Sequence, residues 1–294
     1  MISVLIPTFN RADVLEKALP YYLKNALVSE VIIVDDGSTD KTPDLLQQWS
    51  QQEDKIHYIK QPHNQGSVAA RNVLLQQVKT PYFFMADDDT YPGEDTLAHL
   101  LSALKTHNYA AVAPRIVYLN EQRDECASLS NNTSPLIDIN RLYFNFNSAW
   151  QEEVITLPGL YLAQTKIVKH YTYDPHYQGS AWREESDFGL QLSLDGHTLY
   201  FLGNAPIYEF PKTTHSGGQW SRPLREYIQS AIANNRYFLK KFETELRTQG
   251  ILTTPLWQLR LRFRIQMLRM YCIVRLKQCP SPKAIMWLRQ WYKK

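Results

Sequence analysis

Residues 81–92, PYFFMADDDTYP, place three consecutive aspartates directly after an apolar run. The run predicts a buried strand, and comparable strand-like runs occur on both sides of it. They are ISVLI at 2–6, EVIIV at 30–34, KIHYI at 55–59 and AAVAP at 110–114. Helical stretches alternate with them, at 12–25, 40–52, 66–78 and 94–106. This alternation predicts an α/β fold with a mostly parallel sheet flanked by helices.

Polar side chains stand at the carboxyl ends of the first four predicted strands. They occupy residues 7–11, 35–38, 63–66 and 87–89. In a parallel sheet these ends lie along one edge, and ligands bind in the crevice outside that edge. The sequence therefore predicts one acidic crevice formed by four strand ends.

The three aspartates after the fourth strand are candidates for a metal site. Adjacent carboxylates repel one another and raise one another's pKa, which makes Asp87, Asp88 and Asp89 costly without a cation among them. Mg²⁺ and Mn²⁺ prefer oxygen ligands, supplied by one or two carboxylates together with substrate phosphates. Asp87 and Asp89, two positions apart, are the predicted ligands. The alternative is a solvated acidic turn that caps a helix starting near Glu94.

The second and third strand ends carry candidates for nucleotide binding. The carboxylates of Asp35 and Asp36 can accept hydrogen bonds from a base or a ribose hydroxyl, although a turn with a helix cap is the alternative. Asn64 and Gly66 precede a helix whose first turns contain Arg71. This arginine can hold a phosphate or the edge of the nucleotide, or it can form a surface ion pair with an aspartate.

Four motifs, ISVLIPTFNR, VIIVDDGSTD, NQGSVAARN and FFMADDDTYP, occur in an order and spacing that resemble glycosyltransferase family 2, the inverting enzymes of GT-A fold. The resemblance covers residues 1 to about 115. It implies that Asp36 accepts a hydrogen bond from the base and that Asp87 and Asp89 form a metal-binding DxD motif. The other residues predicted at the nucleotide are Pro7, Thr8, Phe9, Arg11 and Asp88.

A further acidic motif, WREESDFGLQL at 182–192, resembles the segment that carries the catalytic base of this family. By position the base is Glu185, with Glu184 beside it and Asp187 as a helix cap or an acceptor contact. A glutamate in place of the more usual aspartate leaves the base role open between Glu184 and Glu185. Such a carboxylate is needed because an acceptor hydroxyl must lose its proton as it attacks. The alternative is an acidic helix start that the helix dipole favours.

The segment KTTHSGGQWS at 212–221 follows the last predicted strand, and its two glycines suggest a loop that closes over the diphosphate. The resemblance implies a metal or phosphate contact for His215, and a structural or surface histidine is the alternative. Trp182 and Trp220 can stack on the apolar face of a sugar or pack at a domain edge. The predicted sets are Asp87, Asp89 and His215 for the metal, and Trp182 and Asp187 for the acceptor.

The chain has 294 residues, and its 44% of apolar residues suffice for a folded core. Three cysteines without paired spacing favour a reducing compartment, and no basic leader precedes the first apolar run. A cytoplasmic protein is therefore expected. We expect loops over 115–150, strands at 154–164 and 198–209, and helices near Ser186, over 224–247 and after Pro255. The predicted domains are a catalytic domain at 1–220, with a nucleotide half at 1–115 and an acceptor half at 116–220, and a basic helical region at 221–294.

Charge divides the chain unevenly. Residues 246–294 contain 11 Lys and Arg and no Asp or Glu, whereas residues 1–245 contain 21 Lys and Arg against 29 Asp and Glu. The segment LWQLRLRFRIQMLRMYCIVRLKQ at 256–278 mixes Arg with apolar residues and has no apolar run of about 18 residues, so it should not span a bilayer. It is predicted to lie on an anionic membrane surface. A helical pair docked on the catalytic domain and a nucleic-acid patch are the alternatives.

These features together predict a glycosyltransferase that moves a sugar from a nucleoside diphosphate sugar, with a UDP-sugar expected, to a hydroxyl of a glycan or lipid-linked acceptor. The reaction is expected to need Mn²⁺ or Mg²⁺, to invert the anomeric centre and to serve cell-surface polysaccharide or glycolipid synthesis at the inner face of the membrane. No nucleic-acid partner is expected, and a homo-oligomer is compatible with the tail. The alternatives are a nucleotide-sugar binding protein without turnover and a nucleotidyltransferase. Neither a Walker motif nor a dinucleotide glycine motif is present.

Overall fold

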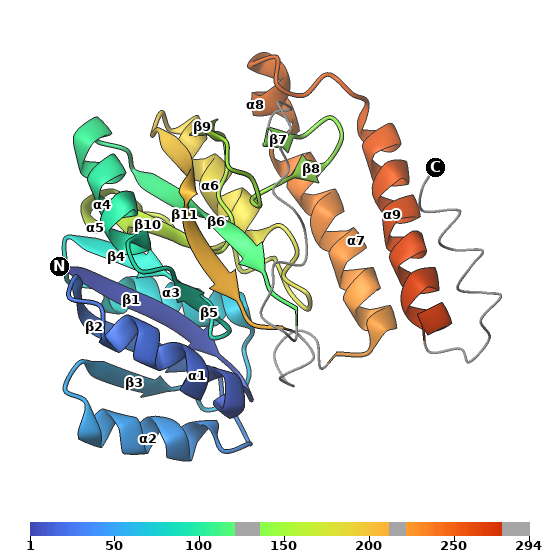
Figure 1. The fold of residues 1–294 in the computed structure, drawn as a ribbon. Helices are drawn as coiled ribbons and strands as arrows, with labels where there is room; N and C mark the ends of the chain where they lie inside the picture. Colours follow the sequence, from blue (N-terminus) through green and yellow to red (C-terminus); the bar gives the residue numbers. More distant parts are fainter. Residues whose placement is uncertain (121–135, 212–221, 278–294) are drawn as a thin grey trace.

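A twisted sheet with helices on both faces forms the body of the molecule (Figure 1). The computed structural model describes residues 1–120, 136–211 and 222–277. Within them a nine-stranded sheet has the order β3-β2-β1-β4-β10-β6-β11-β5, with β9 paired to β11. Its strands are β1 Ile2–Thr8, β2 Val28–Asp35, β3 Ile56–Lys60, β4 Tyr82–Met85, β5 Thr90–Pro92, β6 Ala111–Tyr118, β9 Gln151–Val154, β10 Tyr161–Gln164 and β11 Leu199–Glu209. A separate hairpin pairs β7 Ile137–Asp138 with β8 Tyr143–Phe144.

The sheet confirms the predicted α/β class. Strands β1, β2, β3, β4, β6 and β11 run in one direction, and β5, β9 and β10 run against them. The predicted single strand at 154–164 is wrong, because the chain forms two short strands there. One of them, β10, lies antiparallel between β4 and β6, and the other, β9, pairs with β11.

Helices α1 Ala12–Leu23, α2 Thr42–Gln52, α3 Ser67–Gln77 and α4 Thr96–His107 confirm the four predicted helices of the first half. Alternate side chains of a strand point to opposite faces of the sheet. On β1, Leu5 therefore joins the core that includes α3, whereas Val4 and Ile6 join the core that includes α1 and α4. A hydrophobic core on each face of the sheet thus fixes the strands and the positions of their carboxyl ends.

The second half adds α5 Thr165–Val168 and α6 Glu184–Leu194, followed by α7 Leu224–Lys241, α8 Glu243–Thr248 and α9 Leu256–Lys277. The predicted helix at 224–247 is divided at Phe242, and α9 begins directly after Pro255 as predicted. Leu259, Phe263 and Met267 of α9 are buried at spacings of four residues, so one stripe of the helix packs inward. They belong to the same hydrophobic core as α7 and α6, which supports the docked-helix interpretation of the tail.

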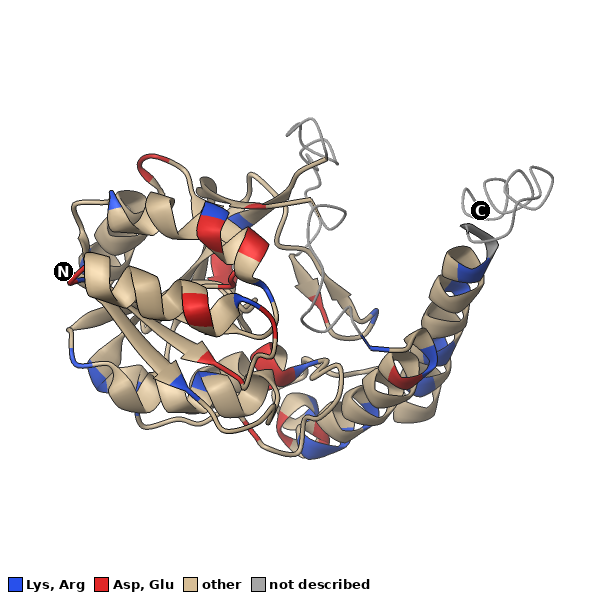
Figure 2. Cartoon of the chain, turned by 90° about the horizontal axis from the view of Figure 1, so that it is seen from below, with Lys and Arg blue, Asp and Glu red and all other residues tan. Residues whose placement is uncertain are grey.

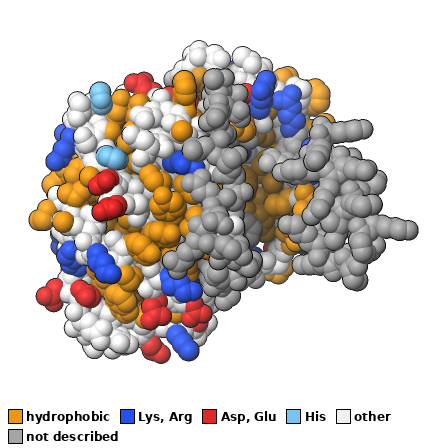
Figure 3. Space-filling view, viewed as in Figure 1, with side chains coloured by type: hydrophobic (Ala, Val, Ile, Leu, Met, Phe, Trp, Pro, Cys, Tyr) orange, Lys and Arg blue, Asp and Glu red, His pale blue; other side chains and the backbone are white. Residues whose placement is uncertain are grey.

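The outer side of α9 exposes apolar side chains together with arginines, among them Arg262, Arg264 and Arg269. Trp257, Leu261, Ile265 and Leu268 are exposed there. Lys and Arg lie along the helix that leads to the C-terminus (Figure 2), and hydrophobic side chains reach the surface over the C-terminal helices (Figure 3). In the part of the chain that the structure describes, none of the helices is both long and apolar enough to cross a membrane.

Candidate active site

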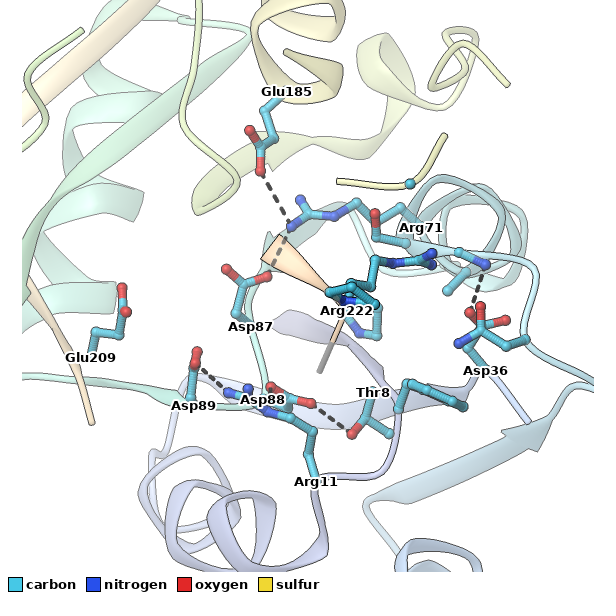
Figure 4. Close-up of a pocket in the computed structure, with 18 residues that line it drawn as sticks. Thr8, Arg11, Asp36, Arg71, Asp87, Asp88, Asp89, Glu185, Glu209 and Arg222 are labelled. Carbon is cyan, nitrogen blue, oxygen red and sulfur yellow. Dashed lines mark hydrogen bonds and ion pairs between the residues drawn. The ribbon is translucent and has the colours of Figure 1, made fainter. Parts of the chain in front are cut away.

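A cavity of about 610 Å³ opens at the carboxyl ends of β1, β2 and β4, where the sequence predicts the crevice. It collects most of the predicted site residues (Figure 4). Those that line it are Pro7, Thr8, Phe9, Arg11, Asp36, Asn64, Gly66, Arg71, Asp87, Asp88, Asp89 and Glu185. The strand-end argument therefore located the cavity, because parallel strands bring their carboxyl ends to one edge.

Arg11, which precedes α1, holds two of the three aspartates. Its Nε lies 3.0 Å from Asp88 Oδ1, and its Nη2 pairs with Asp89. Thr8 Oγ1 donates a hydrogen bond to Asp88 Oδ2 at 2.7 Å. Burial raises the pKa of Asp88 to about 7 against the opposing effect of Arg11. Asp88 is thus held by Arg11 and Thr8, whereas the Asp87 side chain is 38% exposed to solvent.

Arg71 of α3 joins two acidic clusters that are far apart in the sequence. Its Nη2 lies 2.9 Å from Asp87 Oδ1 and 3.8 Å from Glu185 Oε1, and its Nε lies 3.7 Å from Glu184 Oε1. Nη1 donates to the carbonyl oxygen of Gly159 at 3.1 Å. The ion pair with an aspartate that the sequence left as an alternative is therefore present. Only its arginine end is buried, since the Arg71 side chain is 4% exposed and the Asp87 side chain 38% exposed.

The two glutamates at the start of α6 differ in their surroundings. Glu184 is buried, accepts a hydrogen bond from Ser67 Oγ at 3.0 Å, and does not line the cavity. Burial raises the pKa of Glu184 to about 8. Glu185 lines the cavity and its side chain is 34% exposed. Burial of part of this side chain also raises the pKa of Glu185, and Arg71 opposes that rise. The geometry thus favours Glu185 as the group that can reach a substrate.

The backbone before α6 adopts uncommon conformations. Ala181 has φ 49° and Arg183 has φ 81°, and both values are unusual for residues other than glycine. Strain of this kind is often found at functional sites. The helix begins at Glu184, two residues before the predicted start at Ser186, because Arg183 in the left-handed region forms its N-terminal boundary.

The two aspartates at the end of β2 have different surroundings, and each fits one of the two interpretations, nucleotide binding for Asp36 and a turn with a helix cap for Asp35. Asp36 accepts hydrogen bonds from the backbone N–H groups of Gln65 at 2.8 Å and Gly66 at 2.7 Å, and it lines the cavity. Asp35 does not line it. Its Oδ1 accepts from Ser38 N at 2.8 Å and its Oδ2 from Tyr58 Oη at 3.2 Å. The turn-cap alternative therefore describes Asp35, whose side chain is fully buried.

The two predicted acceptor residues lie away from the cavity lining. Asp187 is fully buried and accepts hydrogen bonds from Tyr177 Oη at 2.8 Å and Lys241 Nζ at 2.9 Å. Trp182 packs against Phe263, with ring centroids 5.8 Å apart. Both side chains thus join α6 and its preceding turn to the C-terminal helices, so their position does not support an acceptor contact. His215 and Trp220 lie outside the described residues.

Several lining residues were not predicted. They are Ser67, Ala70, Gly179, Glu209, Arg222 and Pro223. The strand-end argument could have found Glu209, since it is the last residue of β11, which runs parallel to β6. Arg222 precedes α7 and brings a third cation to the cavity. A residue between elements carries no periodic signal that would place it there.

The oxygen atoms present fit a divalent metal only in part. Asp87 and Asp89 offer hard oxygen ligands of the kind that Mg²⁺ and Mn²⁺ prefer, but both carboxylates also pair with arginines. No group of three His, Cys, Asp or Glu suited to a metal exists within residues 1–120, 136–211 and 222–277. The described residues therefore fit an ion that the phosphates of a bound substrate help to hold, and do not by themselves complete a protein-only metal site.

Comparison with known proteins identifies the family of the chain. The model of the family described as glycosyl transferase family 2 matches residues 3–161, more than half of the chain. The chain belongs to this family. The match extends from β1 through the cavity-forming strand ends to β10, and so confirms the resemblance carried by the four N-terminal motifs.

Relatives of this family 2 chain come from several bacteria. The putative teichuronic acid biosynthesis glycosyltransferase TuaG of Bacillus subtilis is 32% identical over 111 residues, which cover 37% of this chain and 44% of the relative. The poly(ribitol-phosphate) beta-glucosyltransferase of Bacillus spizizenii is 25% identical over 202 residues, which cover 60% of this chain and 32% of the relative. The GalNAc(5)-diNAcBac-PP-undecaprenol beta-1,3-glucosyltransferase of Campylobacter jejuni is 33% identical over 105 residues, covering 35% and 33%. The chain thus spans less than half the length of each of these relatives.

Solved structures confirm the fold class of this family 2 chain. TarS 1-349 of S. aureus in complex with UDP matches with a TM-score of 0.56 and 19% identity, over 85% of this chain and 73% of that one. A second structure of TarS 1-349 matches with a TM-score of 0.56 and 20% identity, over 90% and 80%. At these identities the likeness shows the GT-A fold, and the chemistry must be argued from the residues of the cavity.

Proposed function

We propose that this protein transfers a sugar from a nucleoside diphosphate sugar to a hydroxyl group of an acceptor. The observation that carries the proposal is one cavity lined by Asp36, Asp87, Asp89 and Glu185, in which Arg71 pairs with both Asp87 and Glu185. A site for this reaction needs a nucleotide end, a place for the diphosphate and a base, and these residue types supply all three.

The donor is proposed to lie along the carboxyl edge of the sheet, with its base near Phe9 and Asp36 and its diphosphate near Asp87 and Asp89. TarS was solved with UDP, which supports a UDP-sugar as the donor here. Asp87 and Asp89 are the residues that would hold Mn²⁺ or Mg²⁺ together with the diphosphate. The ion would stabilise negative charge on the departing diphosphate.

Glu185 is proposed as the general base. The acceptor oxygen forms a bond to the anomeric carbon as the bond from that carbon to the diphosphate oxygen breaks, and the hydroxyl proton passes to Glu185. A single displacement of this kind inverts the anomeric centre. Arg71 lies 3.8 Å from Glu185 and 2.9 Å from Asp87, so it orients the base toward the donor side of the cavity.

The product is proposed to be a cell-surface polysaccharide or glycolipid. The relatives support this class because their names refer to teichuronic acid, poly(ribitol-phosphate) and an undecaprenol-linked glycan. A lipid-linked acceptor would require the enzyme to work at a membrane surface, and we propose the inner face.

The test is release of nucleoside diphosphate from a panel of UDP- and GDP-sugars, with and without Mn²⁺ and with bacterial envelope extract as the acceptor. Wild-type protein should release the diphosphate from one donor. Asp89→Ala should abolish metal-dependent release, whereas Asp13→Ala, an exposed aspartate of α1, should behave as wild type. Full Asp89→Ala activity in the presence of chelator would remove the metal from the proposal. Nucleotide binding without release would favour a binding protein, and release of pyrophosphate would favour a nucleotidyltransferase.

We further propose that α9 contacts an anionic membrane. Its exposed apolar residues Trp257, Leu261, Ile265 and Leu268 lie within about 80° of one another around a helix with 3.6 residues per turn. That face is about 160° from the buried stripe, so docking on α7 leaves it available. The helix contains arginine and lysine but no acidic residue, which suits an anionic surface.

Sedimentation with vesicles tests this contact. The double variant Trp257→Ser, Leu268→Ser should lower binding to phosphatidylglycerol vesicles about tenfold or more, since each large apolar side chain adds burial that salt does not screen. Trp150→Ser is the matched control, because Trp150 is 49% exposed but lies just before β9. Truncation after about residue 250 should also release the protein, although it removes the buried stripe of α9 as well. Equal partitioning of the double variant and wild type would contradict the membrane contact.

A further inference from the structure

The end of β6 and the end of β11 lie side by side at the cavity. Tyr118, the last residue of β6, pairs with Glu209, the last residue of β11, in a parallel ladder. The backbone N–H of Leu119 donates to the carbonyl oxygen of Glu209 at 3.2 Å and continues this pairing by one residue. Paired residues of neighbouring strands project to the same face of a sheet, so the Tyr118 ring and the Glu209 side chain are neighbours.

Glu209 marks the end of the cavity that lies opposite the proposed nucleotide end. It lines the cavity, and Figure 4 shows it on the other side of the Asp87–Asp89 turn from Asp36. Glu185 lies on α6, above Asp87 in the same view. A donor that runs from Asp36 to the aspartate turn therefore leaves the part between Glu185 and Glu209 for a second substrate.

Tyr118 does not itself line the cavity, but its aromatic side chain stands next to Glu209, which does. It is 42% exposed, which is a large fraction for a ring at the end of a central strand. Partial burial raises the pKa of Tyr118, and the charges of Glu209, Glu185, Asp87 and Asp89 raise it further. The phenol is thus within electrostatic reach of the proposed base.

We propose that Tyr118 and Glu209 form the acceptor subsite, and that this subsite takes the ring of an uncharged sugar rather than a phosphate-bearing acceptor. The inference rests on the proposed function, since it assigns the second substrate of that reaction. The apolar face of a sugar ring packs on an exposed aromatic ring, and its hydroxyl groups donate hydrogen bonds to a carboxylate such as Glu209.

Charge decides between the two acceptor classes. The described residues that line the cavity include six carboxylates, of Asp36, Asp87, Asp88, Asp89, Glu185 and Glu209, and three guanidinium groups, of Arg11, Arg71 and Arg222. Arg11 and Arg71 already pair with these carboxylates. The carboxylates outnumber the guanidinium groups among these residues. Once the diphosphate occupies the aspartate turn, a phosphate group between Glu185 and Glu209 would therefore enter a part of the cavity with an excess of negative charge.

The experiment is binding to an array printed with neutral oligosaccharides and their phosphorylated counterparts, in the presence of Mn²⁺ and of UDP or GDP, whichever binds in a fluorescence titration. Wild type should retain neutral glycans. Tyr118→Ala should weaken that retention about tenfold, and Tyr118→Phe should keep it because the ring remains. Glu209→Lys should shift the preference toward phosphorylated glycans. Tyr143→Ala is the matched control, since Tyr143 is 38% exposed and lies on β8, which pairs with β7 and is not part of the β6–β11 ladder beside the cavity.

Each outcome has a separate meaning. Three results would overturn the subsite while leaving the proposed function in place. Wild type could prefer phosphorylated glycans, it could retain none of the neutral glycans although it binds the nucleotide, or Tyr118→Ala could bind as wild type does. Absence of UDP and GDP binding by wild type would instead count against the proposed function. Equal losses in Tyr118→Ala and Tyr143→Ala would show a general effect of losing a surface ring, and would also overturn the subsite.

Discussion

Replacement of Gly159 by alanine should reduce turnover without unfolding the protein. A β-carbon at this position would lie 2.9 Å from Arg71 Nη2 and 2.9 Å from Glu185 Oε1. Contacts between heavy atoms are favourable at about 3.5–4.0 Å, so each side chain must move by roughly half an ångström or more. The clash involves only the ends of flexible side chains, and the φ of Gly159 is not in the left-handed region, so alanine can adopt this backbone.

The expected magnitude follows from the role of those two groups. A misplacement of about 1 Å at a reacting centre can cost about 100-fold in rate, so we expect a loss of about 10- to 100-fold in turnover. The added methyl group should cost about 1–2 kcal/mol of unfolding free energy, the lower part of the range for overpacking. The assay is diphosphate release at saturating donor, combined with the melting temperature of the same preparation.

Gly93→Ala provides the matched control. A β-carbon there would approach Thr96 Oγ1 at 3.0 Å, a comparable contact with a side chain that does not line the cavity. This variant should lose similar stability and keep its turnover. Wild-type turnover of Gly159→Ala would refute the role given to the Arg71–Glu185 contact, and so would an equal loss of turnover in both variants.

Four other outcomes are expected. Glu185→Gln should lower turnover by about 100-fold or more with donor affinity retained. Glu184→Gln should keep most activity, because burial raises the pKa of Glu184 to about 8 and so favours the uncharged acid at neutral pH, which the glutamine amide resembles in charge and shape. Steady-state kinetics with nucleotide titration separates the two variants. Because burial raises the pKa of Glu185 and a base must be deprotonated, activity should fall with decreasing pH at values above the usual glutamate range, and that acidic limb should vanish in the glutamine variant. Gly189→Ala should lower the melting temperature more than Gly159→Ala does, since its β-carbon would lie 2.5 Å from the backbone nitrogen of Leu157, which cannot move aside cheaply. Lys241→Met should cost about 3–5 kcal/mol in urea unfolding by leaving Asp187 buried without a cation, and a second change, Asp187→Asn, should recover part of the loss.

Local patterns of the sequence predicted the first half of the fold well. The strand-like runs and the helices between them appear within a few residues of their expected positions, because each is an apolar repeat that a sheet or helix face requires. The same argument failed at 154–164, where nothing local shows that β10 would enter the sheet antiparallel between β4 and β6. It also failed at Phe242, where the continuous helical pattern is divided into α7 and α8.

In the candidate site, the sequence predicted the types of residue that are needed but not always their positions. Asp35 and Asp36 are chemically identical neighbours, yet only Asp36 lines the cavity, because successive side chains at a strand end point in different directions. Asp187 is two residues after Glu185, yet its carboxylate turns to Lys241 of α7 and becomes buried. Glu209 and Tyr118 carry no motif, and their place beside the cavity depends on the pairing of β6 with β11.

The sequence by itself determined the family, the order of the elements in the first half and the residues that follow its strands, because these depend on side-chain chemistry and spacing within short segments. It also determined the charge of the tail. Only the tertiary structure decided that Arg71 joins Asp87 to Glu184 and Glu185, and that α9 buries one apolar stripe and exposes another. The physical reason is that ion pairs and burial depend on distances between segments far apart in the chain, and those distances arise only when the sheet and the C-terminal helices pack together.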